Sequence, residues 1–92
     1  MSELRSHKVK RLAMRSMRRG IKEMDLILSS FADLNLSNMD DGALDLYDAL
    51  LNENDHDLYQ WVTRQVDPPE PYAALIKDVQ THIDIHGPAP AG

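Results

Sequence analysis

The apolar residues between Ile21 and Leu34 recur at a helical spacing, and this spacing is the strongest constraint on what the chain can fold into. They are Met24, Ile27, Leu28, Phe31 and Leu34, separated by three, one, three and three residues. Such intervals place the side chains on one side of a helix, whereas a half-buried strand would require strict alternation. The pattern therefore predicts a helix over residues 21–34 that carries the most apolar face of the chain.

The preceding segment, residues 4–19, contains no Gly or Pro and predicts a first helix of about four turns. A helical projection gives this helix one basic stripe, formed by Lys8, Arg11, Arg15 and Arg18. The side chains expected to pack on the opposite side are Val9, Ala13 and Met17. Gly20 follows, and glycine commonly takes the left-handed position just after a helix.

Three more helices are predicted further along the chain. Ser37 and Asp40 resemble a capping box that starts a third helix, and Asn54 or Asp55 caps a short fourth one. Pro71 suits the first position of a fifth helix. The expected inward side chains are Ala43, Tyr47, Leu50 and Leu51 in the third helix, Leu58, Trp61 and Val62 in the fourth, and Tyr72, Leu75, Ile76, Val79 and Ile83 in the fifth.

These segments predict an all-α fold: a small five-helix bundle that forms a single domain and is monomeric when free. A chain of 92 residues without cysteine builds one modest core and no disulfide framework. We expect the domain to cover residues 1–86. Residues 87–92 consist of Gly, Pro and Ala and are expected to form a flexible C-terminal tail.

The sequence also bears on location. No apolar run is long enough to span a bilayer, so no direct membrane insertion is expected, and the N-terminus lacks the hydrophobic region of a signal peptide. These features favour a bacterial cytoplasmic protein. Residues 1–22 are rich in Arg and Ser and nearly free of acid, as mitochondrial transit peptides are, which makes the mitochondrial matrix the alternative.

The net charge of −5 conceals an uneven distribution along the chain. Residues 1–22 carry eight Lys or Arg and one acidic residue. Residues 23–92 carry only two Lys or Arg but fourteen acidic residues. The basic stripe therefore has three interpretations: a solvated face, a contact with nucleic acid, or a contact with protein. An acidic row on the predicted third helix, formed by Asp41, Asp45 and Asp48, could pair with it inside the molecule.

The sequence offers no enzyme signature. It contains neither a nucleophile elbow nor a phosphate-binding glycine loop, and its histidines and carboxylates form no recognisable acid-base pair. His82 and His86 stand four residues apart, a spacing that can hold a divalent metal. Two ligands beside a Gly-Pro tail make a poor site, so we expect exposed polar residues there and no bound metal. The sequence favours a binding protein over an enzyme.

Opposite charges gather around a glycine in residues 18–25, Arg-Arg-Gly-Ile-Lys-Glu-Met-Asp, where the basic part of the chain ends. Together with Phe31-Ala32, Leu46-Tyr47 and the segment 57–61, Asp-Leu-Tyr-Gln-Trp, this stretch resembles the small succinate dehydrogenase assembly factors of bacteria and mitochondria. The resemblance covers about residues 8–86. Its signature is Arg-Gly-x-x-Glu, which here corresponds to Arg19, Gly20 and Glu23.

The resemblance implies a five-helix chaperone-like protein that binds the flavoprotein subunit of succinate dehydrogenase, with fumarate reductase as a further candidate partner. It would promote the covalent attachment of FAD to a histidine of that subunit. FAD then belongs to the partner, and no cofactor is expected to be held firmly by this chain. The predicted partner-binding residues are Arg19, Gly20, Glu23, Arg18, Arg15, Arg11 and Asp25.

Within this set, the side chains of Arg19 and Glu23 are expected to be largely exposed, and Gly20 would allow another backbone to approach closely. The alternative function is an antitoxin-like or nucleic-acid-binding helical module that uses the basic first helix, since some members of the family are described as antitoxins. The acidic remainder of the chain argues against nucleic acid, and no nucleic-acid partner is expected.

Overall fold

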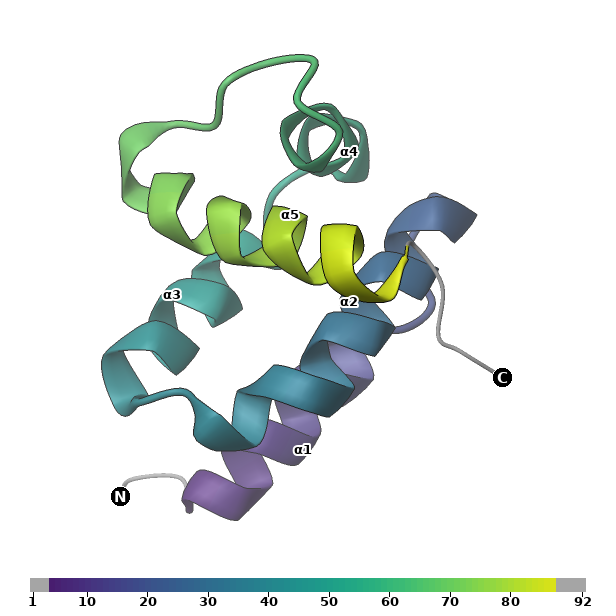
Figure 1. Ribbon diagram of the computed structural model, residues 1–92. Coiled ribbons are helices and arrows are strands. Elements are labelled where there is room, and N and C mark those ends of the chain that lie inside the picture. Colours follow the sequence, from purple (N-terminus) through teal and green to yellow (C-terminus); the bar gives the residue numbers. More distant parts are fainter. Residues whose placement is uncertain (1–3, 88–92) are drawn as a thin grey trace.

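The computed structural model describes residues 4–87, and this part of the chain contains five α-helices and no strand (Figure 1). The helices are α1 (Arg5–Arg15), α2 (Lys22–Asn35), α3 (Asp41–Leu50), α4 (Asp55–Val62) and α5 (Ala73–His86). Two 3₁₀ turns, Leu36–Asn38 and Glu70–Tyr72, precede α3 and α5. The predicted all-α class is confirmed. The predicted tail beyond Gly87 lies outside the described residues.

Helix α2 lies at the centre of the core. It contacts α1, α4 and α5, and Figure 1 shows α1 alongside it and α5 crossing it. The predicted inward residues Met24, Ile27, Leu28 and Phe31 are all buried. Leu34 is 53% exposed, so its predicted core position was wrong. Leu34 instead lines an open groove between α2 and α5.

Three fully buried leucines were absent from the predicted core. Leu12, Leu36 and Leu44 are each 0% exposed, whereas Met17, predicted to pack, is 50% exposed. The reason is local: α1 ends at Arg15, so Met17 lies beyond the last helical turn and does not share the inner face. Trp61 was placed correctly, since it is 8% exposed and its ring stacks on Tyr72 at 6.1 Å between ring centroids.

The acidic row of α3 pairs with Arg5 and with three residues of the basic stripe, as the helical spacing allowed. The fourth residue of the stripe, Arg18, lies beyond the end of α1 and takes no part. Ion pairs join Arg5 to Asp41 at 3.0 Å, Lys8 to Asp45, and both Arg11 and Arg15 to Asp48. Each pair is partly open to solvent and contributes little alone. Together they fix the orientation of α1 against α3, and they neutralise much of the positive charge that the sequence concentrates in α1.

Polar side chains cap α3 and α4, but only the cap of α4 is the predicted one. The side chain of Asp40 accepts the N–H of Ala43 at the start of α3, and Asn54 accepts the N–H of His56 at the start of α4. Ser37 lies in the 3₁₀ turn and makes no cap hydrogen bond there. Asp40 alone therefore supplies the N-cap, and the predicted Ser37–Asp40 capping box did not form.

Candidate functional site

The residues that carry the Arg-Gly-x-x-Glu signature lie in and just after the connector between α1 and α2. We call residues 16–21 the α1–α2 loop. Its anchor is Asp55, the first residue of α4, whose carboxylate accepts the Arg19 Nε–H on Oδ1 at 2.8 Å and the Gly20 backbone N–H on Oδ2 at 2.6 Å. Negative charge is favoured at the first turn of a helix, so α4 also stabilises this carboxylate. One aspartate thus holds two consecutive loop residues.

Arg19 is largely enclosed, contrary to expectation. Besides the pair with Asp55, its Nη1 donates to the carbonyl oxygen of Leu51 at 3.1 Å and of Arg15 at 3.3 Å. Its side chain is 12% exposed and that of Asp55 is 17% exposed. A guanidinium has five N–H donors and needs acceptors when it leaves water, and the ends of α1 and α3 supply them. Arg19 therefore ties three helices together.

Gly20 does not occupy the left-handed position predicted for it. Among the glycines of residues 4–87, only Gly87 has a positive φ. The left-handed residue after α1 is Arg18, with φ 56°. Gly20 is needed for a different reason: a Cβ at this position would lie 2.9 Å from Oδ2 of Asp55. The close approach that glycine allows is made by this chain's own aspartate.

Asp25 braces the same loop from α2. Its Oδ1 accepts the backbone N–H of Arg18 at 2.9 Å and the hydroxyl of Ser29 at 3.2 Å. The side chains of Arg18 and Glu23, by contrast, lie in exposed residues, and neither hydrogen-bonds or forms an ion pair within residues 4–87. The loop is thus held from inside by Asp25 and Asp55, while Arg18 and Glu23 remain available to another molecule.

The other two arginines predicted for the site point toward α3. Arg11 and Arg15 both pair with Asp48, and Arg15 also donates to the side-chain oxygen of Asn52 at 2.7 Å. The structure therefore divides the predicted residues into two groups. Arg19, Gly20, Asp25, Arg15 and Arg11 have contacts within the chain, and Arg18 and Glu23 face solvent. Sequence reasoning missed Asp55, which it treated only as a helix cap.

The end of α1 is secured by a buried hydrogen bond beneath the loop. The hydroxyl groups of Ser16 and Tyr47 lie 2.5 Å apart, and Ser16 also donates to the carbonyl oxygen of Leu12. Burial raises the pKa of Tyr47 to about 12, although the hydrogen bond to Ser16 and the nearby charge of Arg19 act in the opposite direction. Tyr47 therefore stays protonated and holds the start of the loop against α3.

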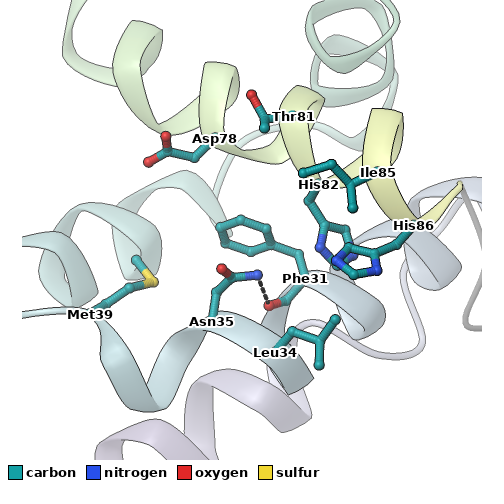
Figure 2. Close-up of a pocket in the computed structure, with 9 residues that line it drawn as sticks. All are labelled: Phe31, Leu34, Asn35, Met39, Asp78, Thr81, His82, Ile85 and His86. Atoms are coloured by element: carbon teal, nitrogen blue, oxygen red, sulfur yellow. Dashed lines mark hydrogen bonds between the residues drawn. The ribbon is translucent and has the colours of Figure 1, made fainter.

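The groove between α2 and α5 that Leu34 lines has a volume of about 440 Å³ and lies far along α2 from the loop (Figure 2). His82 lies at its inner edge, 6% exposed, with Nε2 2.8 Å from the hydroxyl of Ser30. The predicted exposure of His82 was therefore wrong, whereas His86 is exposed. Burial, followed by the nearby His86, lowers the pKa of His82. Residues 4–87 contain no cluster of three or more His, Cys, Asp or Glu suited to a metal ion.

The sequence of most of the chain matches a known protein family. A family model described as "Flavinator of succinate dehydrogenase" matches residues 10–83. The chain belongs to this family. The match begins within α1 and ends in α5, so it includes the α1–α2 loop, Asp55 and the whole core, and it confirms the resemblance that the signature indicated.

Individual members of the family agree. The chain is 48% identical over 65 residues to the mitochondrial succinate dehydrogenase assembly factor 2 of Meyerozyma guilliermondii, which covers 71% of this chain and 48% of the relative. Identity is 56% over 54 residues to the protein of that name from Candida glabrata, covering 59% of this chain and 35% of the relative. The chain thus spans about half or less of the length of these relatives.

The expected bacterial cytoplasmic location was wrong. The relatives from Meyerozyma guilliermondii, Aspergillus flavus and Candida glabrata all carry names that place them in mitochondria. The expectation rested on the lack of an apolar signal, but mitochondrial import does not require an apolar segment. Within residues 4–87, none of the helices has the length and apolar character needed to cross a bilayer.

Proposed function

We propose that this chain is an assembly factor that binds the flavoprotein subunit of succinate dehydrogenase and promotes covalent attachment of FAD to it. The observation that carries the proposal is the family match over residues 10–83, which contains the intact Arg-Gly-x-x-Glu signature on an ordered loop. The names of the relatives describe the same assembly role and point to mitochondria as the compartment.

The proposed role needs no catalytic group on this chain. The flavin and a histidine of the partner supply the reacting atoms, and FAD remains the partner's cofactor. A helper increases the rate when it holds those atoms in a reactive arrangement, because orientation alone lowers the barrier considerably. A small rigid surface is sufficient for that task, and the hydrogen bonds from Asp55 and Asp25 provide the rigidity.

The contact surface in this proposal consists of Arg18 and Glu23, and their position is set by the enclosed Arg19 and by Gly20, both held by Asp55. The two exposed side chains carry opposite charges a short distance apart along the chain, which gives an interface both attraction and a defined orientation. The nucleic-acid alternative fits less well. Lys8, Arg11 and Arg15 already pair with carboxylates of α3, so the stripe offers little free positive charge to phosphates.

Reconstitution with purified components tests the proposal. The flavoprotein subunit, prepared without covalent flavin, is mixed with FAD in the presence or absence of this chain, and the flavin that survives denaturation is measured by its fluorescence on a gel. We expect faster and more complete attachment with the chain, and a parallel reaction with the fumarate reductase flavoprotein shows whether that partner is also served. Equal attachment with and without the chain would overturn the proposal.

A further inference from the structure

We propose that Arg18, rather than the signature residue Arg19, is the arginine that reaches the partner, and that it binds a carboxylate on the surface of the flavoprotein subunit. This inference rests on the proposed function and goes further by assigning separate roles to two adjacent arginines. Arg19 becomes a positioning residue, because its guanidinium is committed to Asp55 and to main-chain carbonyls.

The backbone of Arg18 gives the first reason. Its φ of 56° lies in the left-handed region, which L-residues other than Gly, Asn and Asp seldom adopt. Glycine would occupy this position without strain, so an arginine here reduces stability. Such outliers are found preferentially at functional sites, where the surrounding structure imposes them. The hydrogen bond from the Arg18 N–H to Asp25 imposes this one.

A second arginine with a left-handed backbone conformation, Arg64, offers a comparison, because its side chain has a partner within the chain. Arg64 has φ 65° after α4, and its guanidinium pairs with Asp84 of α5 at 3.0 Å. The strained backbone there accompanies a contact within the chain. Arg18 has no such partner among residues 4–87, although its backbone is equally constrained. The charge of Arg18 is therefore presented outward by a fixed loop.

The surroundings of Arg18 fit a protein partner. Met17, directly before it, is 50% exposed, and Met14, whose carbonyl accepts the Met17 N–H, is 64% exposed. Methionine and arginine are both enriched at protein interfaces, where the flexible thioether adapts to the opposing surface. A nucleic-acid backbone would bring a row of negative charges close to the exposed Glu23, whereas a folded protein can present a single carboxylate to Arg18. That carboxylate can accept two N–H groups from the planar guanidinium.

The test compares two glycine substitutions that relieve the same backbone strain, Arg18→Gly and Arg64→Gly. Affinity for the purified flavoprotein subunit is measured by calorimetry, and the stability of each variant by urea unfolding. We expect Arg18→Gly to be at least as stable as the wild type and to bind about tenfold or more weakly. Arg64→Gly should bind as the wild type does. Arg18→Lys, which keeps the charge but loses the planar fork, should bind with an intermediate affinity.

Three results would overturn the assignment in different ways. If Arg18→Gly binds with wild-type affinity while the wild-type chain binds and promotes flavin attachment, the proposed function stands and the role of Arg18 does not. If the wild-type chain does not bind the flavoprotein subunit at all, the proposed function and this inference both fail. An equal loss of affinity in Arg64→Gly would also contradict the assignment, because the effect would then follow from the backbone change and not from the lost charge.

Discussion

The Oδ2 atom of Asp55 accepts the backbone N–H of Gly20 at 2.6 Å, and a Cβ at Gly20 would lie 2.9 Å from that same oxygen. The family's glycine is therefore explained by a contact inside the molecule. A residue of α4, thirty-five positions away in sequence, sets which side chain the α1–α2 loop can tolerate. Two of the signature residues, Arg19 and Gly20, therefore hold the loop against α4, while the third, Glu23, is exposed and can contact a partner.

Substitution of Gly20 tests this contact. Gly20→Ala should destabilise the protein by about 1 to 3 kcal/mol, because the added methyl group displaces the Asp55 carboxylate and leaves the enclosed guanidinium of Arg19 poorly paired. Gly42→Ala is the matched control: its Cβ would meet Asp40 at 3.6 Å, an ordinary contact, and alanine favours the helix there. Urea unfolding of both variants gives the comparison. A Gly20→Ala protein as stable as Gly42→Ala would refute the account of this glycine.

The pair of Arg19 and Asp55 should contribute more to stability than the exposed pairs of α1. Arg19→Ala leaves an enclosed carboxylate without its partner, and we expect a loss of roughly 2 to 4 kcal/mol, somewhat below the cost for a fully buried pair. Arg5→Ala removes one partner of a pair whose side chains are 44% and 83% exposed, and should cost about 0 to 1 kcal/mol. Double-mutant cycles with Asp55→Ala and Asp41→Ala measure the two couplings. Equal couplings would contradict the enclosed geometry described for Arg19.

Local patterns in the sequence were sufficient to predict the all-α fold and most of the core. Helical spacing placed Phe31, Trp61 and Val79 in the core, and it put the cations of α1 and the acids of α3 on faces that could meet. Both inferences depend on residues within one helix, where periodicity decides orientation. The predicted burial of Leu34 was wrong because burial also depends on whether a second helix covers the position. Helix α5 leaves this end of α2 open.

The candidate site was less accessible to sequence reasoning. Arg19, Gly20 and Glu23 were found from the signature, but the enclosure of Arg19 depends on Asp55, which only the tertiary fold brings to the loop. The early end of α1 could not be read from propensity, and neither could the buried hydrogen bond that joins its C-cap residue Ser16 to Tyr47 of α3. The spacing of residues within one helix gives no indication that Arg19 and Gly20 would meet Asp55, thirty-six and thirty-five positions away.

The buried His82 should make stability depend on pH. Its pKa is lowered in the folded protein, so the unfolded chain binds a proton more readily, and stability should fall as the pH drops below about 6.5, the ordinary value for histidine. His82→Gln, which keeps a side chain able to hydrogen-bond Ser30, should weaken this dependence. His7→Gln, at an exposed position, should leave it unchanged. Urea unfolding between pH 5 and pH 7.5 measures the slopes, and an undiminished slope in His82→Gln would assign the effect to other groups.

We propose that this chain promotes flavin attachment through the surface beside the α1–α2 loop. The most direct test uses cells that lack the protein and are complemented with the wild type, Glu23→Ala or Asp33→Ala, which remove two exposed acidic side chains of the same helix. In-gel fluorescence then reports covalent flavin on the succinate dehydrogenase flavoprotein, and circular dichroism confirms the helix content of each variant. We predict full attachment with the wild type and Asp33→Ala, and weak or absent attachment with Glu23→Ala despite unchanged helix content. Full attachment in cells without the protein would contradict the account.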